Sequence, residues 1–230
     1  MQLASLILPV VLLQGGGKLE IKDVKVGSGD SARPGDVLVM NYTGKLTNGK
    51  EFDSSLKPGR TPFKFTLGAG EVIKGWDQGI QGMKPGGHRH LVIPADMGYG
   101  SQAMGNDIPA NSTLVFDVEL KEILRVKIKT TKAGLGTPVK IGDSVQVHYT
   151  GKFTDGKKFD SSYDRNEPLS VTVGRRGLIP GFTQGLLGMK VGEKRTITIP
   201  PDLGYGARGV GPIPPNSTLV FDLEMVKILK

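Results

Sequence analysis

The chain has 230 residues, of which 37% are hydrophobic; this is enough for two packed domains and argues against wholesale disorder. It contains no cysteine, which excludes disulfides, thiol catalysis and cysteine-ligated zinc. The net charge of +8 is compatible with an acidic partner, but no aromatic residues alternate with the basic ones to form a base-stacking platform, so we expect no nucleic-acid partner.

The N-terminal segment, residues 1–17, contains an apolar run from Leu3 to Leu13. The run has the length of a signal-peptide core and is too short to span a bilayer, so we expect no transmembrane segment. No basic residue precedes it and Pro9 interrupts it, whereas Gly15 and Gly17 satisfy a small-residue cleavage rule. Two interpretations stay open: a signal peptide that is removed, or an N-terminal strand or start-site artefact.

The rest of the chain repeats itself once. The block "YTGKLTNGKEFDSS" from Tyr42 returns as "YTGKFTDGKKFDSS" from Tyr149, with 11 of 14 letters identical. Later blocks return at an offset that drifts from 107 to 105 residues. Solenoid repeats have periods of roughly 20 to 50 residues, so this period indicates a duplicated domain. We expect a first domain over 18–124 and a second over 125–230, joined by a short segment of low flexibility.

Each copy has the pattern of an antiparallel sheet with one helix. Asn48-Gly49 and Asp155-Gly156 lie between strand-like runs and predict hairpins. The segment "TLVFDVELKEI" alternates apolar and polar residues, as a half-buried strand does. One stretch has helical spacing instead, with apolar residues at Val72, Ile73, Trp76, Ile80 and Met83. The predicted fold class is α+β, two tandem domains in which one short helix covers the apolar face of a sheet.

Conventional catalytic motifs are not found in the sequence. His88 and His90 would share one face of a strand, but no third ligand is evident, and a surface position is the simpler interpretation. There is no P-loop and no nucleophile elbow. Asp53 and Asp160 stand beside serines, yet no histidine is repeated with them, which argues against a duplicated triad. We expect no metal and no cofactor.

The repeat preserves five aromatic positions, which in the first and second copy are Tyr42 and Tyr149, Phe52 and Phe159, Trp76 and Phe182, Tyr99 and Tyr205, and Phe116 and Phe221. A role in the core is the ordinary interpretation of each. Two details favour a pocket: both Gly-Tyr-Gly tripeptides have the composition of loops, and an acid directly follows the phenylalanine of each "FDSS" block. Together they predict an apolar pocket with a few oriented polar groups.

One reaction needs little more than such a pocket. Rotation about an X-Pro amide faces a barrier of roughly 18–20 kcal/mol, because the C–N bond has partial double-bond character. Twisting the bond weakens this resonance and leaves a less polar amide, which an apolar pocket favours over the planar form. Catalysis would then be tighter binding of the twisted state, without nucleophile, metal or cofactor.

The segments "YTGKLTNGKEFDSS", "FKFTLGAGEVIKGWDQGIQGM", "IPADMGYG" and "IPANSTLVFDVEL" resemble the FKBP-type peptidyl-prolyl cis-trans isomerases, and the resemblance covers both copies. It implies a half-wrapped antiparallel sheet of five or six strands around one short helix. It also implies a function in protein folding, with X-Pro segments of client proteins and macrolides of the tacrolimus and rapamycin kind as partners. The alternative is a non-catalytic module that binds proline-containing segments, or a chaperone scaffold; we expect a monomer.

Carried onto the first copy, the resemblance implies a pocket with Trp76 as its floor and Ile73 N–H and the Tyr99 hydroxyl as donors to ligand carbonyls. The pocket residues would be Tyr42, Phe52, Asp53, Phe63, Val72, Ile73, Trp76, Tyr99, Ile108 and Phe116. Two departures concern macrolide affinity. The family's frequent arginine after "FDSS" has no clear counterpart in "LKPGRTPF", and Asp107 stands where an apolar residue is common.

The second copy retains Arg165 after its "FDSS" block, and Leu169 stands where the first copy has Phe63. Its implied pocket residues are Tyr149, Phe159, Asp160, Leu178, Ile179, Phe182, Tyr205, Ile213 and Phe221. Because a phenylalanine floor offers less contact area than tryptophan, we expect the first domain to be more active. The residues expected to act in catalysis are Asp53, Tyr99, Trp76, Phe52, Tyr42, Asp160 and Tyr205.

The cellular location is open. The segment "KLEIKDVKVGSG" after the apolar run is most similar to the secretory-pathway members of the family, which favours the endoplasmic reticulum. The chain ends in "KILK" rather than in a retention signal, and the cytoplasm is the alternative.

Overall fold

The computed structural model describes residues 17–175 and 177–229. The apolar run from Leu3 to Leu13, on which the signal-peptide hypothesis depends, lies outside the described residues. Within the described ranges, no helix has the length and apolar character needed to cross a membrane.

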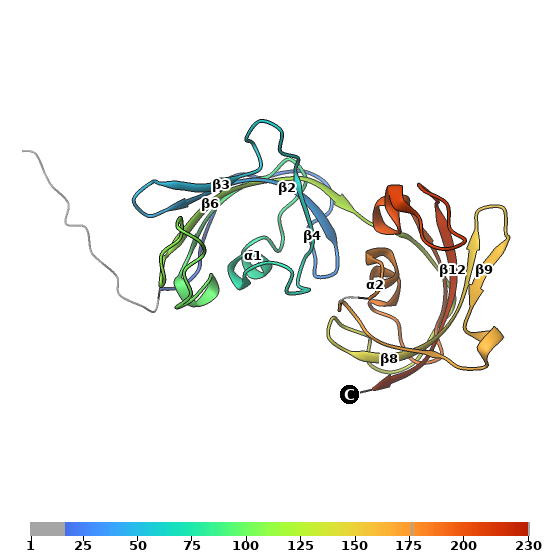
Figure 1. Cartoon of the computed structure of the whole chain (residues 1–230). Coiled ribbons are helices and arrows are strands. Elements are labelled where there is room, and N and C mark those ends of the chain that lie inside the picture. The colour runs from blue at the N-terminus through green and yellow to red at the C-terminus, as the bar shows by residue number, and fades with distance from the viewer. Residues whose placement is uncertain (1–16, 176, 230) are drawn as a thin grey trace, which may run out of the picture.

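The first domain is one antiparallel sheet in the order β1-β5-β6-β2-β3, with β4 paired to β2 on the same sheet. One short helix lies on its concave side (Figure 1). The elements in chain order are β1 (Glu20–Lys25), β2 (Val37–Leu46), β3 (Glu51–Ser54), β4 (Phe63–Thr66), α1 (Lys74–Gly79), β5 (His88–Ile93), η1 (Ala95–Met97) and β6 (Leu114–Leu124).

The second domain repeats this topology in the order β10-β8-β12-β11-β7, with β9 paired to β8. Its elements are β7 (Lys127–Lys132), β8 (Ser144–Phe153), β9 (Lys158–Ser161), η2 (Tyr163–Arg165), β10 (Leu169–Thr172), α2 (Pro180–Leu186), β11 (Lys194–Ile199), η3 (Pro201–Leu203), η4 (Gly206–Arg208) and β12 (Leu219–Leu229). The prediction of two tandem α+β domains is confirmed.

Alternation along β6 builds the first core. Leu114, Phe116, Val118 and Leu120 are buried, and Asp117 between them is exposed, because successive strand residues point to opposite faces. Each fully buried apolar side chain of this size stabilises the fold by about 1.5–3 kcal/mol. The predicted strand thus supplies one layer of the core, and the helix supplies the other.

Helix α1 is shorter than its apolar spacing predicts. Ile73 has extended backbone angles and caps the N-terminus, and Ile80 caps the C-terminus, so the helix spans Lys74–Gly79. Glycine allows it to lie close to the sheet: a Cβ at Gly75 would be 2.4 Å from Cγ2 of Ile93. This close contact fixes Trp76, one residue later, against the inner face of the sheet.

The join between the domains consists of Arg125 and Val126, since β6 ends at Leu124 and β7 begins at Lys127. Two Arg125 nitrogens, Nε and Nη2, each donate to one Asp36 carboxylate oxygen at 2.7 Å. In α2, Gln184 accepts a hydrogen bond from Val126 N–H and donates one to Leu124 C=O, both at 2.9 Å. Side chains of both domains therefore hold the two residues of the join.

Candidate functional site

A cavity of about 390 Å³ opens on the concave side of the first domain, between α1 and the sheet. It is lined by Tyr42, Phe52, Asp53, Phe63, Glu71, Val72, Ile73, Trp76, Tyr99 and Phe116. The structure thus brings together nine of the ten residues predicted for this copy. The tenth, Ile108, is buried in the adjoining core rather than in the lining. Glu71 lies in the lining although the sequence did not indicate it.

Trp76 is the centre of an aromatic cluster at the base of this first-domain pocket. Its ring lies 5.3 Å from the rings of both Tyr42 and Phe116, with interplanar angles of 82° and 83°. Phe63 contacts it in the same edge-to-face manner at 6.1 Å. Such aromatic pairs add about 0.5–1.5 kcal/mol each beyond the area they bury, so the cluster is a rigid surface. The buried Trp76 Nε1 has no hydrogen-bond partner among the described residues.

Polar groups of the pocket converge on Asp53. The Tyr42 hydroxyl donates to its carboxylate at 2.5 Å, and the Ser54 N–H donates to it at 2.9 Å. Burial and this hydrogen bond to Asp53 raise the pKa of Tyr42 to about 12. Burial, with the negative charge of Asp53, also raises the pKa of Tyr99. Both hydroxyls are therefore protonated donors at neutral pH.

An arginine that the sequence reasoning missed also contacts this carboxylate. Arg60 Nη2 lies 3.2 Å from Asp53 Oδ1, although Arg60 follows the acid by seven residues and Arg165 follows Asp160 by five. The expectation that the first copy lacks a counterpart of Arg165 is therefore wrong. The longer loop moves the arginine along the sequence, and its long side chain still reaches the acid. Position in the repeat could not show this, because the two loops differ in length.

The backbone at the start of α1 offers one more donor. Ile73 C=O accepts hydrogen bonds from the N–H groups of Trp76 and Asp77, at 2.9 and 3.2 Å, which begins the helix. The Ile73 N–H itself donates no hydrogen bond to another described residue. It lies in the pocket lining and is available to a carbonyl of a bound ligand.

The second domain gathers its predicted residues around one aromatic cluster. Phe182 replaces the tryptophan, with its ring 5.8 Å from Tyr149 and 5.3 Å from Phe221, again edge to face. Leu169 and Val171 occupy the β10 positions that Phe63 and Phe65 hold in β4. The remaining predicted residues pack against or belong to the same core: Phe159, Leu178, Ile179, Tyr205 and Ile213.

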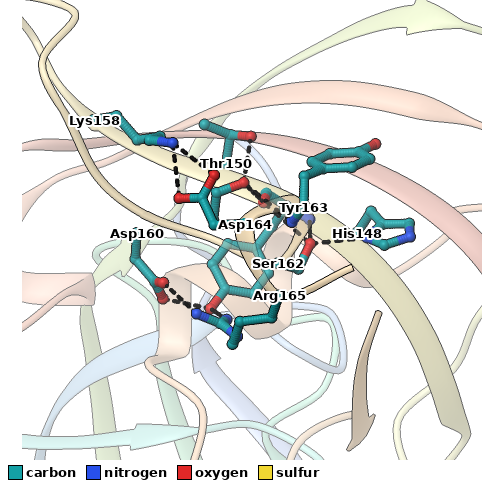
Figure 2. A network of polar contacts seen from close by, with 10 residues as sticks. His148, Thr150, Lys158, Asp160, Ser162, Tyr163, Asp164 and Arg165 are labelled. Atoms are coloured by element: carbon teal, nitrogen blue, oxygen red, sulfur yellow. Dashed lines mark hydrogen bonds and ion pairs between the residues drawn. The ribbon is translucent and has the colours of Figure 1, made fainter. Parts of the chain in front are cut away.

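Arg165 makes two side-chain hydrogen bonds in the second site, whereas Arg60 makes one in the first. Figure 2 shows the Arg165 guanidinium next to the Asp160 carboxylate. It donates to Asp160 Oδ1 and to the Tyr149 hydroxyl, both at 2.8 Å, and Tyr149 in turn donates to Asp160. Burial raises the pKa of Asp160, but the hydrogen bonds from Tyr149 and Arg165 outweigh it and hold this pKa below its ordinary value.

Arg165 is the last residue of helix η2, and His148 packs against residues at the start of this helix. The imidazole stacks on the Tyr163 ring at 4.3 Å with an interplanar angle of 12°, and its Nδ1 lies 2.9 Å from Ser162 Oγ. In the first domain Asn41 and Leu56 occupy these positions. The two sites thus differ on their outer side as well as at the floor.

The histidine pair of β5 lies on the solvent side of the sheet. His90 Nδ1 is 2.7 Å from Asp117 Oδ1, and His88 Nε2 is 3.9 Å from Glu119 Oε1. Within 17–175 and 177–229, no group of three or more histidine or acidic residues has a geometry suited to a metal ion.

Comparison with known proteins gives consistent matches. The profile of the family "FKBP-type peptidyl-prolyl cis-trans isomerase" matches twice, over residues 29–121 and 136–226. Peptidyl-prolyl cis-trans isomerase FKBP10 of Bos taurus is 40% identical over 198 residues, which cover 83% of this chain and 34% of that protein. FKBP9 of Rattus norvegicus is 39% identical over 197 residues, with the same coverage of 83% and 34%. The chain thus spans about a third of the length of these relatives.

A shorter relative matches a little less than half of the chain. FK506-binding protein 1A of Neurospora crassa is 55% identical over 105 residues, which cover 45% of this chain and 88% of that protein.

Proposed function

The chain belongs to the family of FKBP-type peptidyl-prolyl cis-trans isomerases, and we propose that it catalyses cis–trans isomerisation of X-Pro bonds, mainly in the first domain. The observation that carries the proposal is the first-domain pocket, where rigid aromatic walls surround a few oriented donors. Its substrates would be X-Pro segments of client proteins, and macrolides of the tacrolimus and rapamycin kind would compete for the same surface.

The mechanism follows from the character of the walls. A prolyl ring against Trp76 leaves water, and the planar amide loses hydration that its resonance form prefers. The twisted amide is less polar and loses less, so the pocket lowers the barrier of roughly 18–20 kcal/mol. The Ile73 N–H and the Tyr99 hydroxyl would bind the carbonyls that flank the rotating bond. This anchors one side of the substrate while the other turns.

Asp53 holds the donors in place in this account. Its carboxylate accepts from the Tyr42 hydroxyl and the Ser54 N–H, which fixes the pocket wall next to the aromatic cluster. Substituting it by alanine leaves the half-buried Tyr42 hydroxyl without this acceptor. A hydroxyl that is kept from water without a partner costs about 1–3 kcal/mol, so the wall would rearrange to let Tyr42 find another acceptor.

The second domain would be the weaker site. Phe182 offers less surface than Trp76, and Leu169 takes the place of Phe63. Large-to-small changes of apolar contacts commonly cost about 1–3 kcal/mol per site, and each 1.4 kcal/mol that falls on the twisted state slows the reaction about tenfold.

The test is turnover of a short X-Pro peptide by the full chain and by its Asp53→Ala variant. Binding of a rapamycin-type macrolide is followed in parallel by the fluorescence of Trp76, the single tryptophan. We expect turnover by the unaltered protein, a loss of kcat/KM in the variant, and a fluorescence change on binding. Binding without turnover would contradict the proposal and support a proline-segment binding module instead.

A further inference from the structure

A second and larger cavity, of about 740 Å³, lies between the two domains. We call it the interdomain cleft; among its walls are Thr66, Gly70 and Glu71 of the first domain and Arg175, Leu178 and Thr183 of the second. We propose that the cleft extends the peptide-binding surface of the first-domain pocket and selects client segments with acidic residues beside the proline. This inference rests on the proposed function, because it concerns the flanks of the same substrate.

The cleft adjoins the first-domain pocket and includes a residue predicted for the second site. Glu71 lines both the pocket and the cleft. At the other wall, Leu178 is one of the residues predicted for the pocket of the second domain, and it packs against the aromatic core there. An extended peptide with its proline over Trp76 would pass Glu71 as it enters the cleft, because Glu71 lies in the wall of both cavities.

The first-domain wall of the cleft is held in a fixed shape. Thr66 N–H donates to the Glu71 carboxylate at 2.8 Å, and the N–H groups of Gly68 and Gly70 donate to Asp77 at 2.8 and 3.1 Å. These bonds use backbone donors that a loop would otherwise leave to water. The wall is therefore formed before a ligand arrives, which lowers the ordering cost of binding.

The second-domain wall of the cleft differs in charge from the equivalent segment of the first domain, which forms the other wall. In the repeat, Gly177 takes the place of Glu71, Thr183 that of Asp77, and Arg175 that of Ala69. Arg175 is exposed and makes no ion pair or side-chain hydrogen bond with another residue of the described chain. A guanidinium in that position is a suitable partner for a carboxylate, which it can bind through two parallel hydrogen bonds.

The domains are held so that both walls keep their places. Besides the Arg125 and Gln184 contacts at the join, Lys64 of β4 lies 3.7 Å from the Asp202 carboxylate of η3. Figure 1 shows α2 on the side of its sheet that faces the first domain. The cleft is thus part of the folded chain rather than a gap between independent units.

The experiment uses the full chain and three peptides. One is a short X-Pro peptide confined to the pocket. The other two have about ten residues around one X-Pro bond, with glutamates on both flanks in one and glutamines in the other. We expect kcat/KM to favour the acidic peptide about two- to fivefold at low salt, the range of a solvent-exposed ion pair. At about 1 M salt, where the Debye length is near 3 Å, the preference should vanish.

Variants assign the effect to the cleft. Arg175→Glu should abolish or reverse the preference while leaving turnover of the short peptide unchanged. Lys157→Glu, the same charge change in the β8–β9 turn outside the cleft, should keep it. Equal kcat/KM for the two long peptides would overturn the proposal, as would a preference that survives Arg175→Glu. A preference for basic flanks would also overturn it and assign recognition to Glu71. Failure to turn over the short peptide would instead contradict the proposed function.

Discussion

The helices α1 and α2 have the same place in the two domains and different surroundings. Three of the six residues of α1 are buried, against six of the seven residues of α2. The equivalent glutamines show why: Gln78 is exposed, whereas Gln184 is buried and hydrogen-bonded to the backbone of the join. The face of α1 that contains Gln78 is exposed to solvent, whereas the equivalent face of α2 forms part of the interface between the domains.

The join is the first place to test this comparison. Asp36 and Asp143 are equivalent and each accepts a backbone N–H at 2.8 Å, but only Asp36 also receives Arg125. Asp36→Asn should lower the free energy of unfolding by about 1.5–3 kcal/mol, because it weakens charge-assisted hydrogen bonds. Asp143→Asn, which keeps an acceptor for the backbone and loses no arginine, should cost clearly less. Urea unfolding of both variants measures the difference; equal losses would mean that Arg125 does not stabilise the interface.

The pKa values of the tyrosines provide a second comparison of the two sites. Burial raises the pKa of all five tyrosines, to about 12 for Tyr42 and Tyr163. Folded pKa values above the unfolded value of about 10 mean that stability is full below pH 10 and falls as the pH rises toward 12. Ultraviolet titration should therefore detect less tyrosinate at pH 10 in the folded protein than in the unfolded protein. Asp53→Asn should lower the pKa of Tyr42; a tyrosine that ionises normally at pH 10 before unfolding would contradict this account.

The smallest expected effect is a difference in how strongly Arg165 and Arg60 change the pKa of the tyrosine near each of them. Arg165 donates directly to the Tyr149 hydroxyl, and its positive charge lowers the pKa of that tyrosine against the effect of burial. Arg165→Ala should therefore raise the pKa of Tyr149. The Arg60 side chain hydrogen-bonds Asp53 and makes no hydrogen bond to the Tyr42 hydroxyl, so Arg60→Ala should raise the pKa of Tyr42 less. Titration of Cζ-labelled tyrosine by NMR compares them, and equal shifts would argue against this difference between the two arginines.

The sequence patterns predicted the secondary structure of each domain and most of the residues that line the first-domain pocket. The alternation in β6 and the helical spacing around Trp76 indicated one short helix on the apolar face of a sheet, and the structure has that arrangement. Five aromatic residues of the pocket were found because the repeat has an aromatic residue at each of their positions, whereas Phe63, which is Leu169 in the second copy, was implied by the family resemblance. Glu71 was missed since the second copy has glycine there and no pattern marked it. Arg60 was missed because a loop insertion hides a contact made by a long, flexible side chain.

The interdomain contacts could not be predicted for a different reason. Both copies have a glutamine at this position, Gln78 in α1 and Gln184 in α2. The repeat therefore gives no sign that Gln78 is exposed and Gln184 buried. Its burial depends on where the first domain lies on α2, and that placement results from contacts far apart in the sequence, such as Arg125 with Asp36. The cleft has the same origin, whereas the charge difference between its two walls is visible in the aligned repeat.

We propose that most of the turnover takes place in the first-domain pocket, because its aromatic floor is larger than that of the second domain. The direct measurement is kcat/KM on a short X-Pro peptide for the full chain with its floors exchanged. Trp76→Phe with Phe63→Leu gives the first domain the side chains of the second, and should lower kcat/KM about tenfold. Adding Phe182→Trp and Leu169→Phe to that protein should restore part of the rate, with urea unfolding as the check that each variant is folded. An unchanged rate after the first exchange, or no recovery after the second, would contradict the account.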